Sequence, residues 1–329
     1  DAFRPAYIGR FSNTYYRASQ LQRDLLPKLA PHGPVPDWAA IERQFERPWL
    51  DHFNSWLIQN IAPGRNQPAY GRESARLNSI VAVMLMLDVP DERKEQLLIN
   101  YVQFGIDLAG LAQNGRQWFS DGGHWQGRKW PILFASLMLD APELRDFPEV
   151  NMNGRIYGPA RIAPSEAVPN PKTLFQEDLD TYYGKGGEGQ TVLWQIVLHG
   201  GPKPTYEEKP RADFTKGEHW MDGYRFNNAA SAIGVALAAQ HMKVKAIWNH
   251  DAFFDYMDRW MSPDEKWAEI TWLREGMTRS LDPFVEAMWY AHRPSVPEQP
   301  GGRDNLKWVW DEDEKSYEGY FVPNPPVGE

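Results

Sequence analysis

The residue types best suited to proton transfer and anion binding gather in residues 218–228, EHWMDGYRFNN. Tyr224 can act there as a general acid or base, because cationic neighbours lower the pKa of a phenol. Arg225 and Asn227 are donors of the kind that bind a carboxylate. An Ala-rich helical stretch follows, so we expect this segment at a helix N-terminus, where backbone amides add further donors. The alternative is an ordinary capped helix with Asn227 or Asn228 as N-cap.

Two further segments combine histidine with glycine. The loop DGGHWQGR at 121–128 brings His124 and Arg128 together just before a predicted helix. Glycine lets the backbone approach a ligand, histidine exchanges protons near neutral pH, and arginine binds a carboxylate bidentately. His199 ends the apolar run TVLWQIVL and precedes two glycines. The alternatives are a solvated helix-entry turn for the loop and a core histidine with a polar partner for His199.

The acidic run QEDLD at 176–180 offers paired carboxylates from Glu177, Asp178 and Asp180. Two carboxylates on either side of a sugar bond are the machinery of glycoside hydrolysis. More often, however, such a run is a solvated surface. Asp121 is a further carboxylate candidate for the same chemistry.

Motifs for metals and nucleotides are missing from the sequence, which contains no HExxH, cysteine cluster, EF-hand loop, P-loop or GxGxxG. A GxSxG elbow is missing as well, which disfavours a serine hydrolase. His250 and Asp255 are poorly spaced for a metal pair, and we interpret Asn249 as a helix N-cap. We therefore predict no cofactor and no metal site, with Ca²⁺ assistance possible but not indicated.

Composition limits the classes of partner. The chain has 329 residues, a formal net charge of −9 and no cysteine. The negative charge argues against nucleic-acid binding but permits a local basic cleft for an anionic ligand. No apolar run reaches the roughly 18–20 residues that span a membrane. The 15 Trp, 14 Tyr and 15 Phe suit either a groove that stacks on sugar rings or a helical core rich in aromatics.

Helical periodicity covers most of the chain, and the helices alternate with polar loops at intervals of about 30–40 residues, the rhythm of helical hairpins in toroids and solenoids. We predict helices over residues 15–29, from Asp37 through Phe45, over 49–61, 72–87, from Pro90 to 108, over 129–139, 227–242, 247–261, from Pro263 through 272, and over 283–290.

Two regions differ from this rhythm. Residues 151–216 are rich in Pro, Gly and charge, and long irregular stretches inside a domain are usually functional loops. Within them, residues 191–198 predict a short strand or a buried helix. The Pro- and Gly-rich tail holds Trp308, Trp310 and Tyr320, so we expect it to pack back on the rest of the chain.

Four strings in the sequence resemble the alginate lyase-like group of helical-toroid polysaccharide lyases, in particular the branch that acts on polymannuronate or glucuronan. They are DGGHWQGRKWPILFA, TVLWQIVLHGGP, YRFNNAASAIGVALAA and WNHDAFFDYMDRWM, and they lie within residues 70–261. The Asn-Asn-His signature of the better-known alginate lyases is missing, because no histidine follows Asn227 and Asn228.

The resemblance implies a mostly α fold, an (α/α) barrel (toroid) of helical hairpins, with residues 1–329 as one catalytic domain and 151–216 as loops over one end. It also implies β-elimination on a uronic acid. One group neutralises the sugar carboxylate, a base removes the C5 proton, and an acid protonates the leaving O4. In such lyases tyrosine often serves as base, acid or both.

Carried over to this sequence, the resemblance makes Tyr224 the first choice for acid and base. Arg225 or Asn227 would hold the carboxylate or keep Tyr224 acidic, and His199, then His124, would be the second base or the neutraliser. Residues expected to line the substrate groove or bind substrate are Asn227, Arg128, Gln195, Trp194, Arg72, His219 and Trp220.

The sequence thus predicts a periplasmic or secreted polysaccharide lyase, monomeric or dimeric, whose partner is an acidic polysaccharide and which binds neither nucleic acid nor membrane. Two other classes stay open. A glycoside hydrolase on an (α/α) barrel would use the carboxylates of residues 176–180, and a sugar-binding protein would leave the polymer intact.

Overall fold

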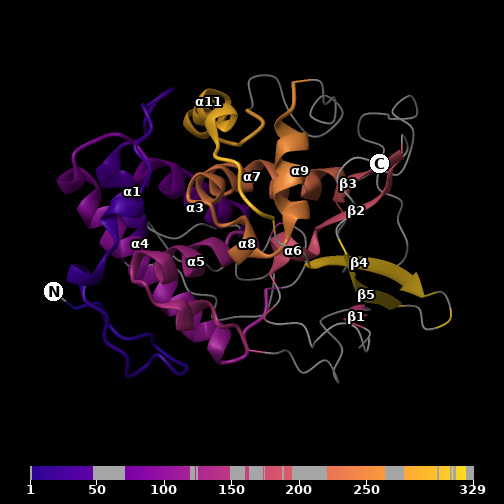
Figure 1. The fold of residues 1–329 in the computed structure, drawn as a ribbon, viewed down its shortest axis with the longest axis horizontal. Helices are drawn as coiled ribbons and strands as arrows, with labels where there is room; N and C mark the ends of the chain where they lie inside the picture. Colours follow the sequence, from indigo (N-terminus) through magenta and orange to yellow (C-terminus); the bar gives the residue numbers. More distant parts are fainter. Residues whose placement is uncertain are drawn as a thin grey trace.

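The computed structural model describes residues 2–46, 71–118, 123, 125–148, 160–162, 173, 175–186, 189–194, 221–263, 278–301, 304–311, 313 and 316–323. This part of the chain is mostly helical, with two small sheets at one side (Figure 1). None of its helices is long and apolar enough to cross a membrane.

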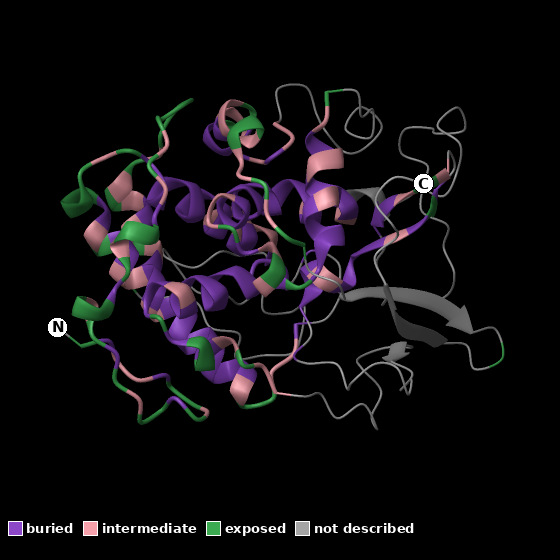
Figure 2. Cartoon of the chain, viewed as in Figure 1, coloured by how far each residue is buried: buried purple, intermediate pink, exposed green. Residues whose placement is uncertain are grey.

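Paired helices form the core. α3 (Gly71–Leu85) packs against α7 (Met221–His241), and α4 (Asp91–Gln113) packs against α5 (Lys129–Met138). Uninterrupted runs of buried residues, such as 78–85 in α3 and 104–112 in α4, show that these helices are enclosed on more than one side, as the purple ribbon of Figure 2 shows.

Shorter helices complete the helical part. α1 (Trp38–Glu46) begins where Asp37 accepts a hydrogen bond from the backbone N–H of Ala40, at 2.8 Å. α11 (Pro283–His292) is capped by Asp282, and a side-chain oxygen at a helix N-terminus satisfies otherwise unpaired amides. The other α-helices are α6 (Gln176–Leu179), α8 (Lys245–Trp248) and α9 (Asp251–Met261), and short 3₁₀ helices lie at Pro142–Arg145 and Arg293–Ser295.

Residues 151–216 contribute strands. β2 (Thr181–Gly186) and β3 (Gly189–Trp194) form an antiparallel hairpin, which confirms a strand where the sequence left strand and helix open. In the tail, β4 (Asp304–Asp311) pairs antiparallel with β5 (Ser316–Pro323), and β1 (Ala160–Ile162) adds to β5 in parallel. β4 also contacts β2, α6 and α9, so the tail packs back on the chain as expected.

One predicted helix is wrong. Residues 15–29 form only two short 3₁₀ turns, Ala18–Gln20 and Arg23–Leu25. Tyr16, Leu21 and Leu26 of this stretch are buried against the core, and its backbone bonds to other elements, for example from the N–H of Leu29 to the carbonyl of Met86 at 2.8 Å. Tertiary contacts therefore replace the helical hydrogen bonds that the spacing alone predicts.

The helix predicted over 247–261 is interrupted. Asn249 has φ 59° and ψ 37°, and it ends α8 as a left-handed C-cap; His250 then stands at the N-cap position of α9. Our interpretation of Asn249 as an N-cap is wrong, because asparagine tolerates the left-handed conformation that ends a helix.

The helices predicted over 72–87, 129–139 and 283–290 are confirmed within one or two residues. Those over 49–61 and from Pro263 through 272 lie largely or wholly outside the described residues.

Candidate functional site

The segment with Tyr224 lies inside a helix. α7 already begins at Met221, so Asn227 and Asn228 belong to its second turn and neither is an N-cap. The backbone N–H groups of these two residues are therefore used for hydrogen bonds within the helix, and they are not the free donors that we expected for a ligand. Tyr224, Asn227 and Asn228 follow an i, i+3, i+4 spacing, which places them on one side of α7.

Arg72 of α3 meets this side of α7. Its Nη1 donates to Oδ1 of Asn227 at 2.9 Å, across 155 residues of sequence. The Arg72 side chain is 30% exposed, and Tyr224 and Asn227 are partly buried. The structure thus brings Arg72 and Asn227 together as a pair of donor-bearing side chains that keep contact with solvent.

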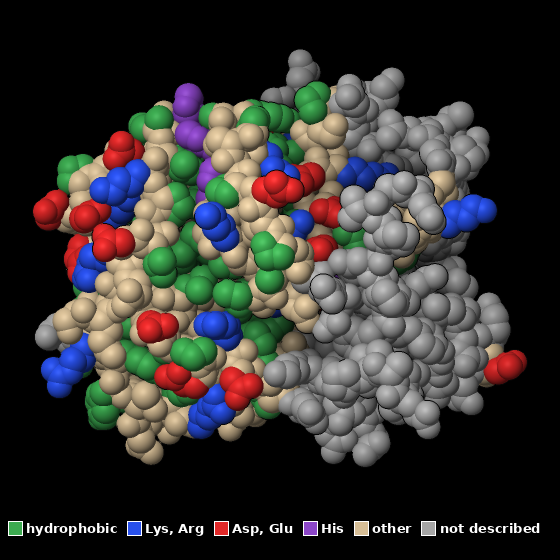
Figure 3. Space-filling model, viewed as in Figure 1, with side chains coloured by type: hydrophobic (Ala, Val, Ile, Leu, Met, Phe, Trp, Pro, Cys, Tyr) green, Lys and Arg blue, Asp and Glu red, His purple; other side chains and the backbone are tan. Residues whose placement is uncertain are grey.

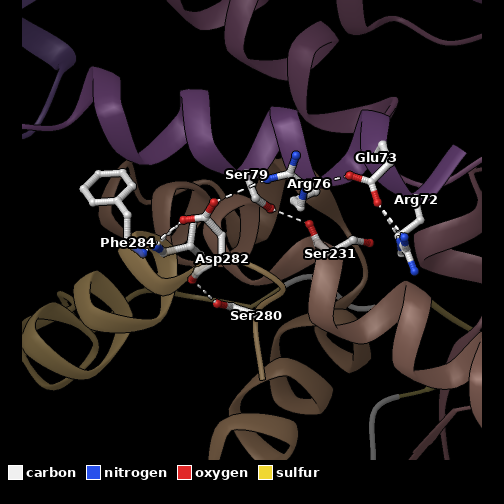
Figure 4. Close-up of polar contacts among 9 residues, drawn as sticks. Arg72, Glu73, Arg76, Ser79, Ser231, Ser280, Asp282 and Phe284 are labelled. Carbon is white, nitrogen blue, oxygen red and sulfur yellow. Dashed lines mark hydrogen bonds and ion pairs between the residues drawn. The ribbon is translucent and has the colours of Figure 1, made fainter. Parts of the chain in front are cut away.

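Charges on α3 are balanced beside this pair (Figure 4). Glu73 accepts from Nε of Arg72 and from Nε of Arg76, both at 2.8 Å. Burial alone would raise the pKa of Glu73, but the hydrogen bonds and charges of Arg76 and Arg72 lower it below its ordinary value. Arg76 also lies 3.4 Å from Asp282, the cap of α11. Glu73 therefore stays anionic and holds both arginines in place.

The acidic run at 176–180 is buried. Glu177 and Asp180 are each 2% exposed, and Gln176 is fully enclosed, so the expectation of a solvated surface is wrong for these residues. Glu177 accepts from the backbone N–H groups of Gly127 and Lys129, both at 3.2 Å. Gln176 accepts from the N–H of Trp125 at 2.9 Å. This helix therefore holds the backbone turn formed by residues 125–129, which we call the 125–129 turn.

α6 also reaches α7. Oδ2 of Asp180 accepts from Nε2 of Gln176 at 2.9 Å and from Nδ2 of Asn228 at 3.1 Å. Asp178, in contrast, binds Nζ of Lys129 at 2.5 Å and Nε1 of Trp248 at 2.9 Å. Two segments that the sequence analysis treated separately, the Gly-rich loop and the Tyr224 segment, thus meet at the acidic run.

Glu177 has an unusual titration. Burial, together with the negative charge of Asp178, raises its pKa to about 7, and the amide hydrogen bonds and the charge of Lys129 offset this only in part. A carboxyl group that changes charge near neutral pH inside a protein is either a functional group or a structural anchor.

Three predicted site residues lie in the interior. Arg128 is 1% exposed and donates to the carbonyl of Gln126 at 2.6 Å, and Trp194 of β3 is equally enclosed. Arg225 is 2% exposed, with its guanidinium carbon 5.9 Å from the ring centroid of Trp260. Because a side chain must be accessible to touch a polymer, the burial of these three residues argues against their lining a substrate groove. The predicted residues that lie outside the described part are His124, His199, His219, Trp220, Gln195 and Asp121.

Histidines gather elsewhere. The rings of His32 and His292 lie 5.3 Å apart, and those of His241 and His292 lie 6.4 Å apart; Figure 3 shows histidine side chains grouped on one face. His241 is the last residue of α7, about 25 Å from Tyr224 along the helix axis. Burial lowers the pKa of His241, which favours its neutral form. This cluster is therefore not part of the candidate site.

Sequence reasoning missed two residues at the site. Asn78 is buried within the apolar helix α3 and donates to the carbonyl of Gly127 at 2.8 Å, and Gln176 was not singled out within its acidic run. A polar residue at the start of a long apolar run is a signal that points to a buried partner, and Asn78, which precedes the run IVAVML by one residue, carries it.

Neither a metal site nor a known relative identifies the function of this site. In the described part of the chain, no group of three or more His, Cys, Asp or Glu residues is arranged to hold a metal ion. Comparisons with protein-family models, curated proteins and solved structures find no match to this chain. Function is therefore inferred from the chemistry and geometry of the site.

Proposed function

We propose that this protein is a polysaccharide lyase that cleaves a uronic-acid polymer, alginate (polymannuronate) or glucuronan, by β-elimination into unsaturated oligosaccharides. The observation that carries the proposal is the Arg72–Asn227 pair on the same side of α7 as Tyr224. β-Elimination next to a carboxylate requires donors that stabilise the negative charge developing on that group.

The pair is oriented for this task. Because Oδ1 of Asn227 accepts from Arg72, the Nδ2 hydrogens of the same amide face away from that guanidinium and can donate to a substrate carboxylate. Tyr224, one turn earlier, removes the C5 proton. In this step Tyr224 acts as a phenolate; the released electron pair forms the C4–C5 double bond, the C4–O4 bond breaks, and the phenol of Tyr224 then gives its proton to O4, so the same side chain serves as base and acid.

The proposal extends to the fold and setting of the protein. The mostly helical architecture is compatible with one (α/α)-toroid catalytic domain, which would present the substrate groove at the N-terminal part of α7. The enzyme would work without a bound cofactor, in the periplasm or outside the cell, as a monomer or dimer. A glycoside hydrolase would need accessible carboxylates, and the enclosure of Glu177 and Asp180 speaks against that role for them.

The test is the ultraviolet absorbance of unsaturated uronides during incubation with polymannuronate, polyguluronate, glucuronan and hyaluronan. Tyr224→Phe is expected to lower kcat by about 10²- to 10⁴-fold, the usual contribution of an acid–base group. Asn227→Asp keeps an acceptor for Arg72 but sets a negative charge against the substrate, so kcat/KM is expected to fall while the protein stays folded. Tyr15→Phe is the matched control, because Tyr15 is 70% exposed on the N-terminal segment.

Three outcomes would contradict the proposal. Reducing ends that appear without any rise in absorbance would show a hydrolase. Binding without a change in chain length would show a sugar-binding protein. Full activity of Tyr224→Phe on a substrate of the wild type would remove Tyr224 from the chemistry.

A further inference from the structure

Two sets of buried hydrogen bonds, joined through the backbone of α6, connect α3 with α7. The first set starts at Asn78 of α3, whose Nδ2 binds the carbonyl of Gly127, and it continues from the N–H of Gly127 to Glu177 of α6. On the same short helix Gln176 binds Asp180, and Asp180 accepts from Asn228 of α7. The five side chains in these two sets are all 2% exposed or less: Asn78, Gln176, Glu177, Asp180 and Asn228.

Stability alone does not explain such an arrangement. Two carboxyl groups are enclosed here, and apolar side chains of similar size would often stabilise a core as well or better. The hydrogen bonds between these groups favour one relative placement of the elements that carry them, because any other placement breaks bonds that enclosed polar atoms cannot remake with water.

The hydrogen bond between Asp180 and Asn228 lies next to the candidate site. Asn228 directly follows Asn227 and lies one turn after Tyr224 on α7. Holding the Asn228 side chain therefore fixes the rotation of α7 about its axis at the turn that also carries Asn227, and Asn227 must meet Arg72 at 2.9 Å.

We propose that Asp180 is a positioning residue, which acts through Asn228 to hold the Arg72–Asn227 pair and Tyr224 in their working arrangement. This inference rests on the proposed lyase function for its effect on catalysis. Its structural part, the anchoring of α7 by α6, is measurable without a substrate.

The first experiment compares kinetics. Asp180→Ala is expected to lower kcat by about 100-fold, the cost of a displacement near 1 Å in a reacting group, with a smaller change in KM. Combining Asp180→Asn with Asn228→Asp restores the hydrogen bond in the reverse direction, and this double variant is expected to recover more activity than either single change. Asp178→Asn is the matched control, because it removes a neighbouring carboxylate whose partners are Lys129 and Trp248. It is expected to lower the melting temperature but to keep kcat.

The second experiment measures amide hydrogen exchange in α7 around Tyr224–Asn228 and in the 125–129 turn. Faster exchange in Asp180→Ala, reversed in the double variant, is the expected result. Should Asp180→Ala not fold, Asp180→Asn alone is compared with the double variant in the same way. Unchanged exchange in both segments, or a double variant no better than its single parents, would overturn the proposal. If the wild type cleaves no uronan, the lyase proposal fails, and exchange still decides whether Asp180 anchors α7.

Discussion

At the scale of single residues, exposure separates the polar groups of the site by role. Arg72, Asn227 and Tyr224 keep partial contact with solvent, as groups that touch a polymer must. Glu177 and Asp180 are enclosed and bind other parts of the chain. Both carboxylates are of a type that catalyses sugar chemistry elsewhere, so burial and partners, and not residue type, indicate what each one does here.

The titration of Glu177 is expected to make the free energy of unfolding depend on pH. Its pKa is about 7 in the folded chain against an ordinary value of 4.5, so the native state favours the protonated form. Its contribution to the free energy of unfolding is fully present below pH 4.5 and is lost as pH rises through about 7. The loss amounts to about 3 kcal/mol, taken from the pKa difference.

Glu177→Gln is expected to remove this contribution, because the amide keeps an acceptor oxygen but does not titrate. Urea unfolding of both proteins between pH 4 and 8 measures it as the difference between the two curves, in which the other titrating groups cancel. A difference that does not change with pH would show that Glu177 keeps one protonation state throughout.

At the scale of elements, the close contact of α3 with α7 decides the geometry of the site. A Cβ added at Gly234 would lie 2.4 Å from the backbone carbonyl oxygen of Ser79, so the two helices approach at a point where only glycine fits. Beside it, Oγ of Ser79 donates to the carbonyl of Ser231 at 2.6 Å. This contact brings the helix carrying Arg72 to the helix carrying Asn227.

Gly234→Ala tests this contact through the sign of its effect. Helix propensity alone predicts a gain of about 1 kcal/mol from alanine inside a helix. The clash with the Ser79 carbonyl predicts a net loss of about 1–3 kcal/mol, which thermal or urea unfolding would measure. A gain in stability would mean that α3 and α7 separate at this point without cost.

At the scale of the whole molecule, the C-terminal strands are tied to the middle of the sequence. β5 of the tail pairs in parallel with β1, with Tyr317 opposite Ala160, and β4 contacts β2, α6 and α9. Backbone pairing between such distant segments closes long loops, and its loss frees them.

Ending the chain after Gly301 is therefore expected to lower the melting temperature and to broaden the unfolding transition, because β1 then loses its partner strand. Circular dichroism on heating measures both effects. An unchanged, equally sharp transition would show that the tail sheet is an appendage that does not stabilise the helical part.

The sequence by itself determined the helices with the strongest apolar periodicity. α3, α5 and α11 begin and end within about two residues of the predicted bounds, and α4 begins as predicted but runs five residues further, to Gln113; their apolar side chains recur on faces that only a helix can bury together. The start of α1 at Asp37 and the strand within 191–198 could likewise be predicted, because both depend on the residues next to them in the sequence. The residue types of the candidate site were visible for the same reason.

Only the tertiary structure decided how these pieces meet. The pairing of Arg72 with Asn227 spans 155 residues, and no local pattern encodes it. The run at 176–180 has the composition of a surface, yet Glu177 and Asp180 are buried, because Gly127 and Lys129 donate to Oε1 of Glu177 and Asn228 donates to Oδ2 of Asp180. The stretch at 15–29 kept its apolar spacing but lost its helix to backbone bonds with the end of α3. Local residue preferences therefore predict many of the helices and strands, whereas contacts between residues distant in sequence determine how these elements are arranged.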